Sequence, residues 1–177
     1  MKHQPHDFQK ASDTVRSYLS FKLGEEFFSI PVMKVLEILE VPKITKVPHS
    51  PDFLKGVINL RGAVLPVIDT RVKFGMTPTD FSINTSILVL SVQHDEDVLT
   101  VGVLVDSVVE VFEIDDSEIK PSPSIGAKYK AEFIEGMINY EDQFMMLLDI
   151  DQIFSLIEIQ NVLMSTEELH ETSKENA

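Results

Sequence analysis

The 177-residue sequence has no cysteine and few basic residues, and each shortage excludes a class of function. Without cysteine there is no disulfide, no thiol nucleophile and no thiolate ligand for a metal, which is compatible with a reducing cytosol. The 15 lysines and arginines stand against 29 aspartates and glutamates, which gives a formal net charge of −14. Because such a charge repels phosphate backbones and anionic lipid surfaces, we expect no nucleic-acid partner.

Long hydrophobic runs are missing as well. No stretch approaches the roughly twenty apolar residues that cross a bilayer, and the N-terminal MKHQPHDFQKASD is polar. We therefore expect a cytoplasmic protein without direct membrane insertion. Glycine and proline are too few for a low-complexity chain, and the 44% of hydrophobic residues suffices for a globular core.

What the sequence does contain is a series of strand-like segments. Residues 18–23 and 27–30 flank a turn at Gly24-Glu25-Glu26, and β-branched runs recur at 82–92, 98–105 and 108–114. Residues 33–40 are ambiguous between helix and strand. Apolar residues from 150 to 163 recur at helical spacing, with Asp149 or Asp151 as the cap. The sequence predicts a mainly β protein with short helices and a C-terminal helix.

The ends of the chain differ in composition from its middle. Residues 1–16 form a polar leader and residues 165–177 an acidic tail, and we expect both to be flexible. The folded domain is predicted at 17–164.

A weak internal repeat organises this domain. A shift of 80 residues lays positions 51–74 on 131–154, with identical pairs Phe53/Phe133, Gly56/Gly136, Ile58/Ile138, Asn59/Asn139, Asp69/Asp149 and Phe74/Phe154. Residues 35–38 likewise resemble residues 108–111. Chance coincidence of two similar hairpins is the alternative, but the ordered match favours two related half-barrels, at about 17–80 and 81–164, that can exchange strands.

The segment from Asn59 to Gly62 interrupts an apolar run and is predicted to form a type I turn. Leu60 and Arg61 would then occupy its central positions and point outward, with Asn139 to Asp142 as the equivalent turn. The two repeat glycines suit tight bends at a barrel corner. From these residues alone, Arg61 is either a solvated turn residue or an interface anchor.

No arrangement of residues indicates catalysis. Nucleotide-binding, acyl-transfer and zinc-protease motifs are absent, the histidines are dispersed, and the carboxylate clusters at 95–97 and 115–118 lack the spacing of a calcium loop. Asp69 and Asp149 are better explained as helix caps. We expect no enzymatic activity, no cofactor and no metal site.

Three segments, YLSFKLGEEFFSIPVMKVLEI, PDFLKGVINLRGAVLPVIDTRVKFG and VGVLVDSVVEV, closely resemble the CheW family of bacterial chemotaxis coupling proteins. The resemblance covers about residues 17–160. It implies two intertwined five-stranded SH3-like β-barrels on a shared core, and a non-enzymatic adaptor. Its implied partners are the cytoplasmic hairpin tip of methyl-accepting chemotaxis receptors and the regulatory domain of a CheA-type histidine kinase, within membrane-associated arrays.

The resemblance also implies two contact surfaces. The receptor-binding positions fall on β-like and turn residues of the first half: Val35, Leu36, Glu37, Ile38, Gly56, Asn59, Leu60 and Arg61. The kinase-binding positions are placed near the first hairpin: Leu23, Ile30 and Val32. Pro31, where many relatives carry an acidic residue, marks a strand end and puts the kinase-contact geometry in doubt.

Two alternatives remain open from the sequence. The adaptor could belong to a related chemosensory pathway with another output, such as pilus motility. A small enzyme with a site in the cleft between the barrels is the rival from a different class, and it would need paired titratable groups in that cleft.

Overall fold

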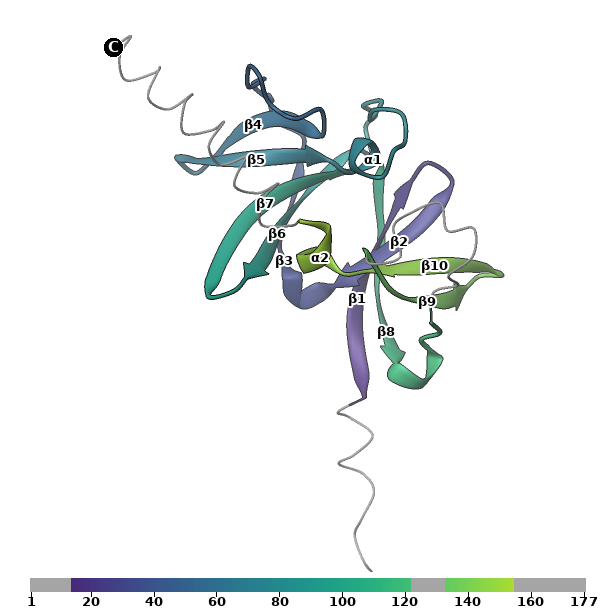
Figure 1. Ribbon diagram of the computed structural model, residues 1–177. Helices are drawn as coiled ribbons and strands as arrows, with labels where there is room; N and C mark the ends of the chain where they lie inside the picture. Colours follow the sequence, from purple (N-terminus) through teal and green to yellow (C-terminus); the bar gives the residue numbers. More distant parts are fainter. Residues whose placement is uncertain (1–13, 122–132, 155–177) are drawn as a thin grey trace, which may run out of the picture.

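The computed structural model describes residues 14–121 and 133–154 (Figure 1). Ten strands make up most of this part of the chain: β1 Val15–Leu23, β2 Glu26–Pro31, β3 Val35–Glu40, β4 Leu54–Leu60, β5 Ala63–Asp69, β6 Ser86–His94, β7 Asp97–Val105, β8 Ser107–Asp115, β9 Ile134–Tyr140 and β10 Gln143–Leu148. Four helical turns follow β2, β5, β8 and β10, respectively: η1 Val32–Lys34, α1 Thr70–Lys73, η2 Asp116–Glu118 and α2 Ile150–Ile153. No helix within these residues is long and apolar enough to cross a membrane.

The strands form two five-stranded sheets: one takes strands from both ends of the chain, and the other contains the five consecutive strands β3 to β7. The orders are β8-β1-β2-β10-β9 and β3-β6-β7-β5-β4. Isolated bridges, Lys120 to Met137 and Thr45 to Val57, connect the two edges of each sheet, so each curls into a small barrel. We call the first barrel A and the second barrel B. The mainly β fold with two SH3-like barrels is confirmed.

The chain passes from one barrel to the other at two points. It leaves barrel A after β2 to enter β3, and it leaves barrel B after β7 to enter β8. The largest apolar cluster lies between the barrels and contains Phe28, Leu90 and Val103, all buried. Smaller clusters fill barrel B, around Ile87, and barrel A, around Met145. Burial of this shared core holds the two barrels together.

The internal repeat is visible in three dimensions. The β4-β5-α1 and β9-β10-α2 units have the same pairing, with register shifts near Gly56 and Gly136. Asp69 accepts a hydrogen bond from the Arg71 amide, and Asp149 accepts one from the Gln152 amide, so both aspartates are caps as predicted. The predicted C-terminal helix begins at Ile150, and its positions beyond 154 lie outside the described residues.

Two predictions about local structure need refinement. The ambiguous residues 33–40 are a 3₁₀ turn followed by strand β3, and Pro31 ends β2 immediately before that turn. Strand β1 begins at Val15, inside the predicted leader. The predicted acidic tail lies outside the described residues.

The predicted type I turn is wrong. Leu60 pairs directly with Ala63, which leaves only Arg61 and Gly62 in the loop, both with positive φ (49° and 87°) as in a type I′ turn. The mirror-image turn occurs because its twist matches that of the flanking strands. The equivalent turn, Glu141-Asp142, also has positive φ at both residues, so the conformation belongs to the hairpin and does not depend on the arginine.

Candidate functional site

The predicted receptor-binding residues lie in barrel B, on β3 and on the β4-β5 hairpin. An ion pair joins these two elements: the Arg61 guanidinium donates to both carboxylate oxygens of Glu37, with Nη2 to Oε2 at 2.6 Å and Nη1 to Oε1 at 3.2 Å. The Arg61 side chain is 73% exposed and that of Glu37 31% exposed. The hydrogen bonds from Arg61 lower the pKa of Glu37 below its usual value, so the carboxylate stays ionised.

The hairpin turn fixes where Arg61 stands. The Gly62 amide donates to Oδ1 of Asn59 at 2.8 Å, which closes the turn beneath the arginine. Leu60 is half-buried against the core of barrel B. Asn59 and Leu60 therefore shape and anchor the turn, whereas Arg61 extends beyond it.

Strand β3 presents apolar side chains next to this ion pair. Leu36 and Ile38 are 59% and 47% exposed, while Val35 packs against the shared core and Leu39 against the core of barrel B. The strand thus alternates between anchoring and exposed residues. Leu36 and Ile38 adjoin Glu37 along the strand, and exposed apolar residues of this kind suit an amphipathic partner.

Gly56 contributes to this site through the backbone alone. It is buried, and a Cβ added to it would lie 2.3 Å from the Thr45 carbonyl oxygen and 2.7 Å from Cγ2 of Ile44. Only glycine allows the 41–45 segment to pair with β4 at this point. Gly56 therefore shapes the barrel and offers no contact surface.

The residues predicted to contact the kinase at the first hairpin are buried or half-buried. Leu23 and Ile30 are fully buried in the shared core, so their side chains offer nothing to a partner. Val32, in the 3₁₀ turn after β2, is half-buried against the same core. Their apolar character reflects packing between the barrels.

Barrel A carries an equivalent of the Glu37 site that residue-by-residue reasoning missed. Glu110 on β8 occupies the position of Glu37, and the Tyr140 hydroxyl at the end of β9 donates to it. This hydrogen bond is the main cause that raises the pKa of Tyr140 to about 12. Val109 and Val111 flank Glu110 and are 38% and 60% exposed, like Leu36 and Ile38 around Glu37. The match of residues 35–38 to residues 108–111 was the sequence signal for this equivalent site in barrel A.

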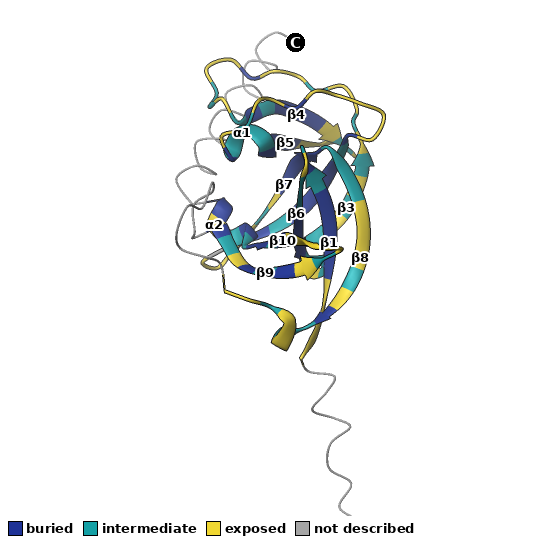
Figure 2. Cartoon of the chain, turned by 90° about the vertical axis from the view of Figure 1, so that its right-hand side faces the viewer, coloured by how far each residue is buried: buried dark blue, intermediate teal, exposed yellow. Residues whose placement is uncertain are grey.

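The two strands β3 and β8 run along the same side of the molecule (Figure 2). Val35 of β3 and Val108 of β8 both pack against the shared core. The exposed apolar residues of these strands (Leu36, Ile38, Val109, Val111), together with the Glu37–Arg61 and Glu110–Tyr140 pairs, are called the docking surface below.

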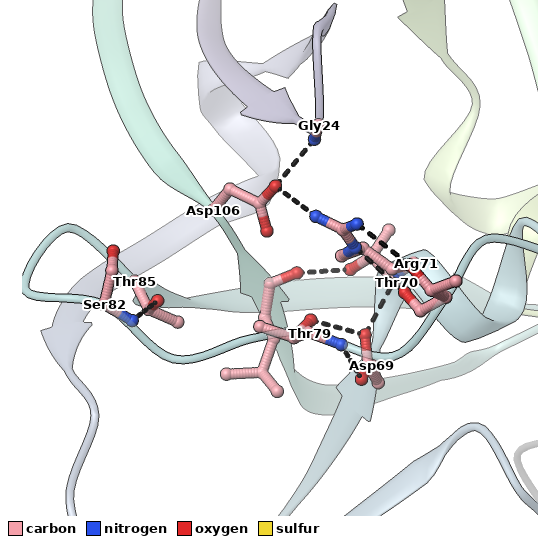
Figure 3. A network of polar contacts seen from close by, with 10 residues as sticks. Gly24, Asp69, Thr70, Arg71, Thr79, Ser82, Thr85 and Asp106 are labelled. Atoms are coloured by element: carbon pink, nitrogen blue, oxygen red, sulfur yellow. Dashed lines mark hydrogen bonds and ion pairs between the residues drawn. The ribbon is translucent and has the colours of Figure 1, made fainter.

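The acidic side chains and histidines of the described residues are dispersed, and one pocket lies beside a buried carboxylate. Within 14–121 and 133–154, no three His, Asp or Glu side chains gather as metal ligands. A shallow pocket of about 230 Å³ beside Lys46 and Lys55 reaches Asp69. The carboxylate of Asp69 already accepts hydrogen bonds from Thr79 and Arg71 (Figure 3), so it serves as a structural acceptor and helix cap.

Comparison with known proteins agrees with this geometry. Residues 17–158 match the family model described as a CheW-like domain. Chemotaxis protein CheW of Klebsiella aerogenes is 34% identical over 146 residues, which cover 82% of this chain and 86% of the relative. Probable chemotaxis protein CheW of Rhizobium etli is 35% identical over 140 residues, or 79% and 88% of the two chains.

A solved structure shares the fold as well. The crystal structure of the scaffolding protein TtCheW from Thermoanaerobacter tengcongensis superposes with a TM-score of 0.73 at 28% identity, covering 89% of this chain and 96% of that one. Two exchanged barrels, a family model that spans most of the chain and relatives above 30% identity lead to one conclusion: the chain belongs to the CheW-like family of chemotaxis proteins.

Proposed function

We propose that this protein is a non-enzymatic adaptor that couples the cytoplasmic hairpin tip of chemoreceptors to a CheA-type histidine kinase in a membrane-associated array. The observation that carries the proposal is the docking surface, in which exposed apolar residues lie on the same strands as Glu37 and Glu110, and Glu37 is held by Arg61. A receptor tip is an amphipathic helical hairpin, and such a surface receives helices by their apolar faces.

The Glu37–Arg61 pair gives the surface its selectivity. Because Glu37 holds Arg61 by two hydrogen bonds, the guanidinium is oriented before the partner arrives and loses less side-chain entropy on binding. Its remaining N–H groups can donate to an acidic or carbonyl group on the receptor tip. Charge at the rim then selects partner orientation, while the apolar residues supply contact area.

Coupling to the kinase follows from the arrangement of the barrels. The docking surface spans residues from both barrels, and both barrels pack on one shared core. A partner that shifts β3 or β8 therefore acts on the rest of the adaptor, where the kinase regulatory domain would bind. Which pathway receives the output depends on the receptor and kinase that bind.

The test is calorimetric titration of the full chain with a receptor hairpin fragment and, separately, with the kinase regulatory domain. We expect micromolar binding to both. Arg61→Glu should weaken receptor binding by about 2 kcal/mol, as loss of an interface anchor does. Arg16→Glu is the matched control, because it makes the same charge change at an exposed arginine paired with Asp116 in barrel A.

A charge swap separates a direct contact from an internal one. The double variant Arg61→Glu, Glu37→Arg restores an ion pair between the hairpin and β3. Receptor affinity that stays low in the double variant shows that Arg61 contacts the receptor, whereas full recovery shows that it only orders the hairpin. Wild-type affinity in Arg61→Glu would reject its role altogether.

A further inference from the structure

Two ion pairs involve equivalent residues of α1 and α2 in the repeat and have opposite polarity. In the first, Nη1 of Arg71 on α1 donates to Oδ2 of Asp106 at 2.6 Å (Figure 3). In the second, Nζ of Lys34 donates to both carboxylate oxygens of Asp151 on α2, at 3.0 and 3.2 Å. The 80-residue shift of the repeat lays Arg71 on Asp151, so the helix supplies the cation in one pair and the anion in the other.

The other partner of each pair immediately precedes a crossover strand. Lys34 is the last residue before β3, and Asp106 is the last residue before β8. Each of these strands carries the chain from one barrel into the other, and each helix follows a strand of the barrel that the chain is leaving: α2 follows β10 of barrel A, and α1 follows β5 of barrel B. The two pairs therefore tie the starts of β3 and β8 to the opposite barrel.

Each carboxylate also binds a backbone amide. Asp106 accepts from the Gly24 amide in the β1-β2 turn at 2.6 Å, and Asp151 accepts from the Gln93 amide at the end of β6 at 2.9 Å. Gly24 belongs to barrel A and Gln93 to barrel B, so each cluster joins groups of both barrels. The side chains of the Arg71 pair are 18% and 23% exposed and those of the Lys34 pair 28% and 36% exposed, so solvent screens them only in part.

We infer that the Lys34–Asp151 and Arg71–Asp106 pairs position the docking surface by fixing where β3 and β8 leave the junction of the two barrels. Leu36 and Glu37 follow Lys34 within three residues, and Val109 and Glu110 follow Asp106 within four. When a charge-assisted contact holds the first residues of a strand, those residues move little. The exposed residues that follow then keep the arrangement that a partner recognises. The inference rests on the proposed function for the identity of that partner.

The experiment uses hydrogen exchange on the full chain with Lys34→Met, Arg71→Met and the double variant. Lys34→Met should speed exchange of the β3 amides and Arg71→Met that of the β8 amides, each by about tenfold, while the β4-β5 and β9-β10 hairpins keep wild-type rates. Methionine preserves the length and packing of the stem. Arg16→Met is the control, since it breaks an exposed ion pair within barrel A.

Calorimetry on the same variants tests the link to binding. Both single variants should weaken binding of the receptor hairpin fragment by about threefold to tenfold, although neither side chain belongs to the docking surface. Arg71 also donates to Thr77, so Arg71→Met can lose further stability; Lys34→Met has no such contact and keeps the inference testable.

Three results would overturn the inference. Exchange that rises equally in all strands would show that the pairs only stabilise the fold, and exchange no faster than in Arg16→Met would show no positioning role. If exchange rises only in β3 or β8 but receptor affinity is unaltered, the pairs hold these strands without affecting binding at the docking surface. If the wild-type chain binds no receptor fragment, the proposed function fails, and the exchange pattern alone then decides whether the pairs position β3 and β8.

Discussion

At the scale of single residues, the ionisation of Glu37 reports directly on the ion pair with Arg61. Because hydrogen bonds from Arg61 lower the pKa of Glu37, the stability that the pair contributes is present above the ordinary pKa of glutamate and is lost as the pH falls through the lowered value. Arg61→Gln should return the pKa of Glu37 toward its ordinary value, which NMR titration of its side-chain carboxyl carbon measures. An unchanged pKa in Arg61→Gln would show that the pair does not persist in solution.

Two glycines of the same hairpin unit should respond very differently to alanine. At Gly56 a Cβ would collide with the backbone of residue 45, which cannot rotate away, whereas at Gly62 nothing lies within 4 Å. Gly56→Ala should lower the free energy of unfolding by about 3 kcal/mol through overpacking and strain, and Gly62→Ala by about 1 kcal/mol through its positive φ alone. Urea unfolding of both variants gives the comparison. Equal losses would mean that the 41–45 segment shifts freely away from β4.

At the scale of elements, the sequence predicts strands better than it predicts which side chains they expose. Alternation and β-branched runs located most strands, because backbone pleating imposes its period on the residues themselves. The turn at Arg61 was missed because strand register, a pairing between distant backbones, decides its type. Leu23 and Ile30 were assigned to a contact surface because residue type alone does not distinguish an apolar core residue from an apolar interface residue; both are buried.

In the candidate site, too, the sequence indicated the residues but not the contacts between their side chains. The family resemblance pointed to the residues of β3 and to Arg61. The structure adds that Arg61 donates two hydrogen bonds to Glu37 of β3. The Glu110–Tyr140 counterpart could have been suspected from the repeat, but the donor changes from arginine to tyrosine and comes from a different position of the hairpin. Such a substitution of one donor for another is visible only once the two strands are placed side by side.

Exposed apolar residues of β3 should matter for binding and little for folding. Leu36→Ser and Ile38→Ser should each weaken binding of the receptor hairpin fragment by about 1–2 kcal/mol, because they remove apolar contact area from the docking surface. Val98→Ser is the matched control, since Val98 is 62% exposed but lies on the β6-β7 hairpin. Titration calorimetry with urea unfolding separates the two effects, and equal affinity of all three variants would place the receptor elsewhere.

At the scale of the whole molecule, exchange of strands makes the two barrels one folding unit. Barrel A combines β1 and β2 with β8, β9 and β10, and barrel B combines β3, β4 and β5 with β6 and β7. The shared core draws buried residues from both sheets, including Phe28, which stacks on Phe21 and packs against Phe74. Barrel B is one continuous segment, 35–105, whereas barrel A closes around it from both sides, and each barrel needs strands of both repeat halves. This arrangement is also why a partner on one barrel can influence the other.

The interlocked topology predicts that half of the chain will not fold alone. In a fragment of residues 14–80, β3 loses its sheet neighbour β6 and β5 loses β7, although the β1-β2 and β4-β5 hairpins keep their local pairing. Isolated hairpins are marginal in water, and the apolar face built for the shared core would be exposed. We expect poorly dispersed amide signals in an NMR spectrum of the fragment and native-like signals only after the fragment of residues 81–177 is added. Native dispersion in the first fragment by itself would show that its half forms a barrel without exchanged strands, and that the coupling attributed to the shared core has another origin.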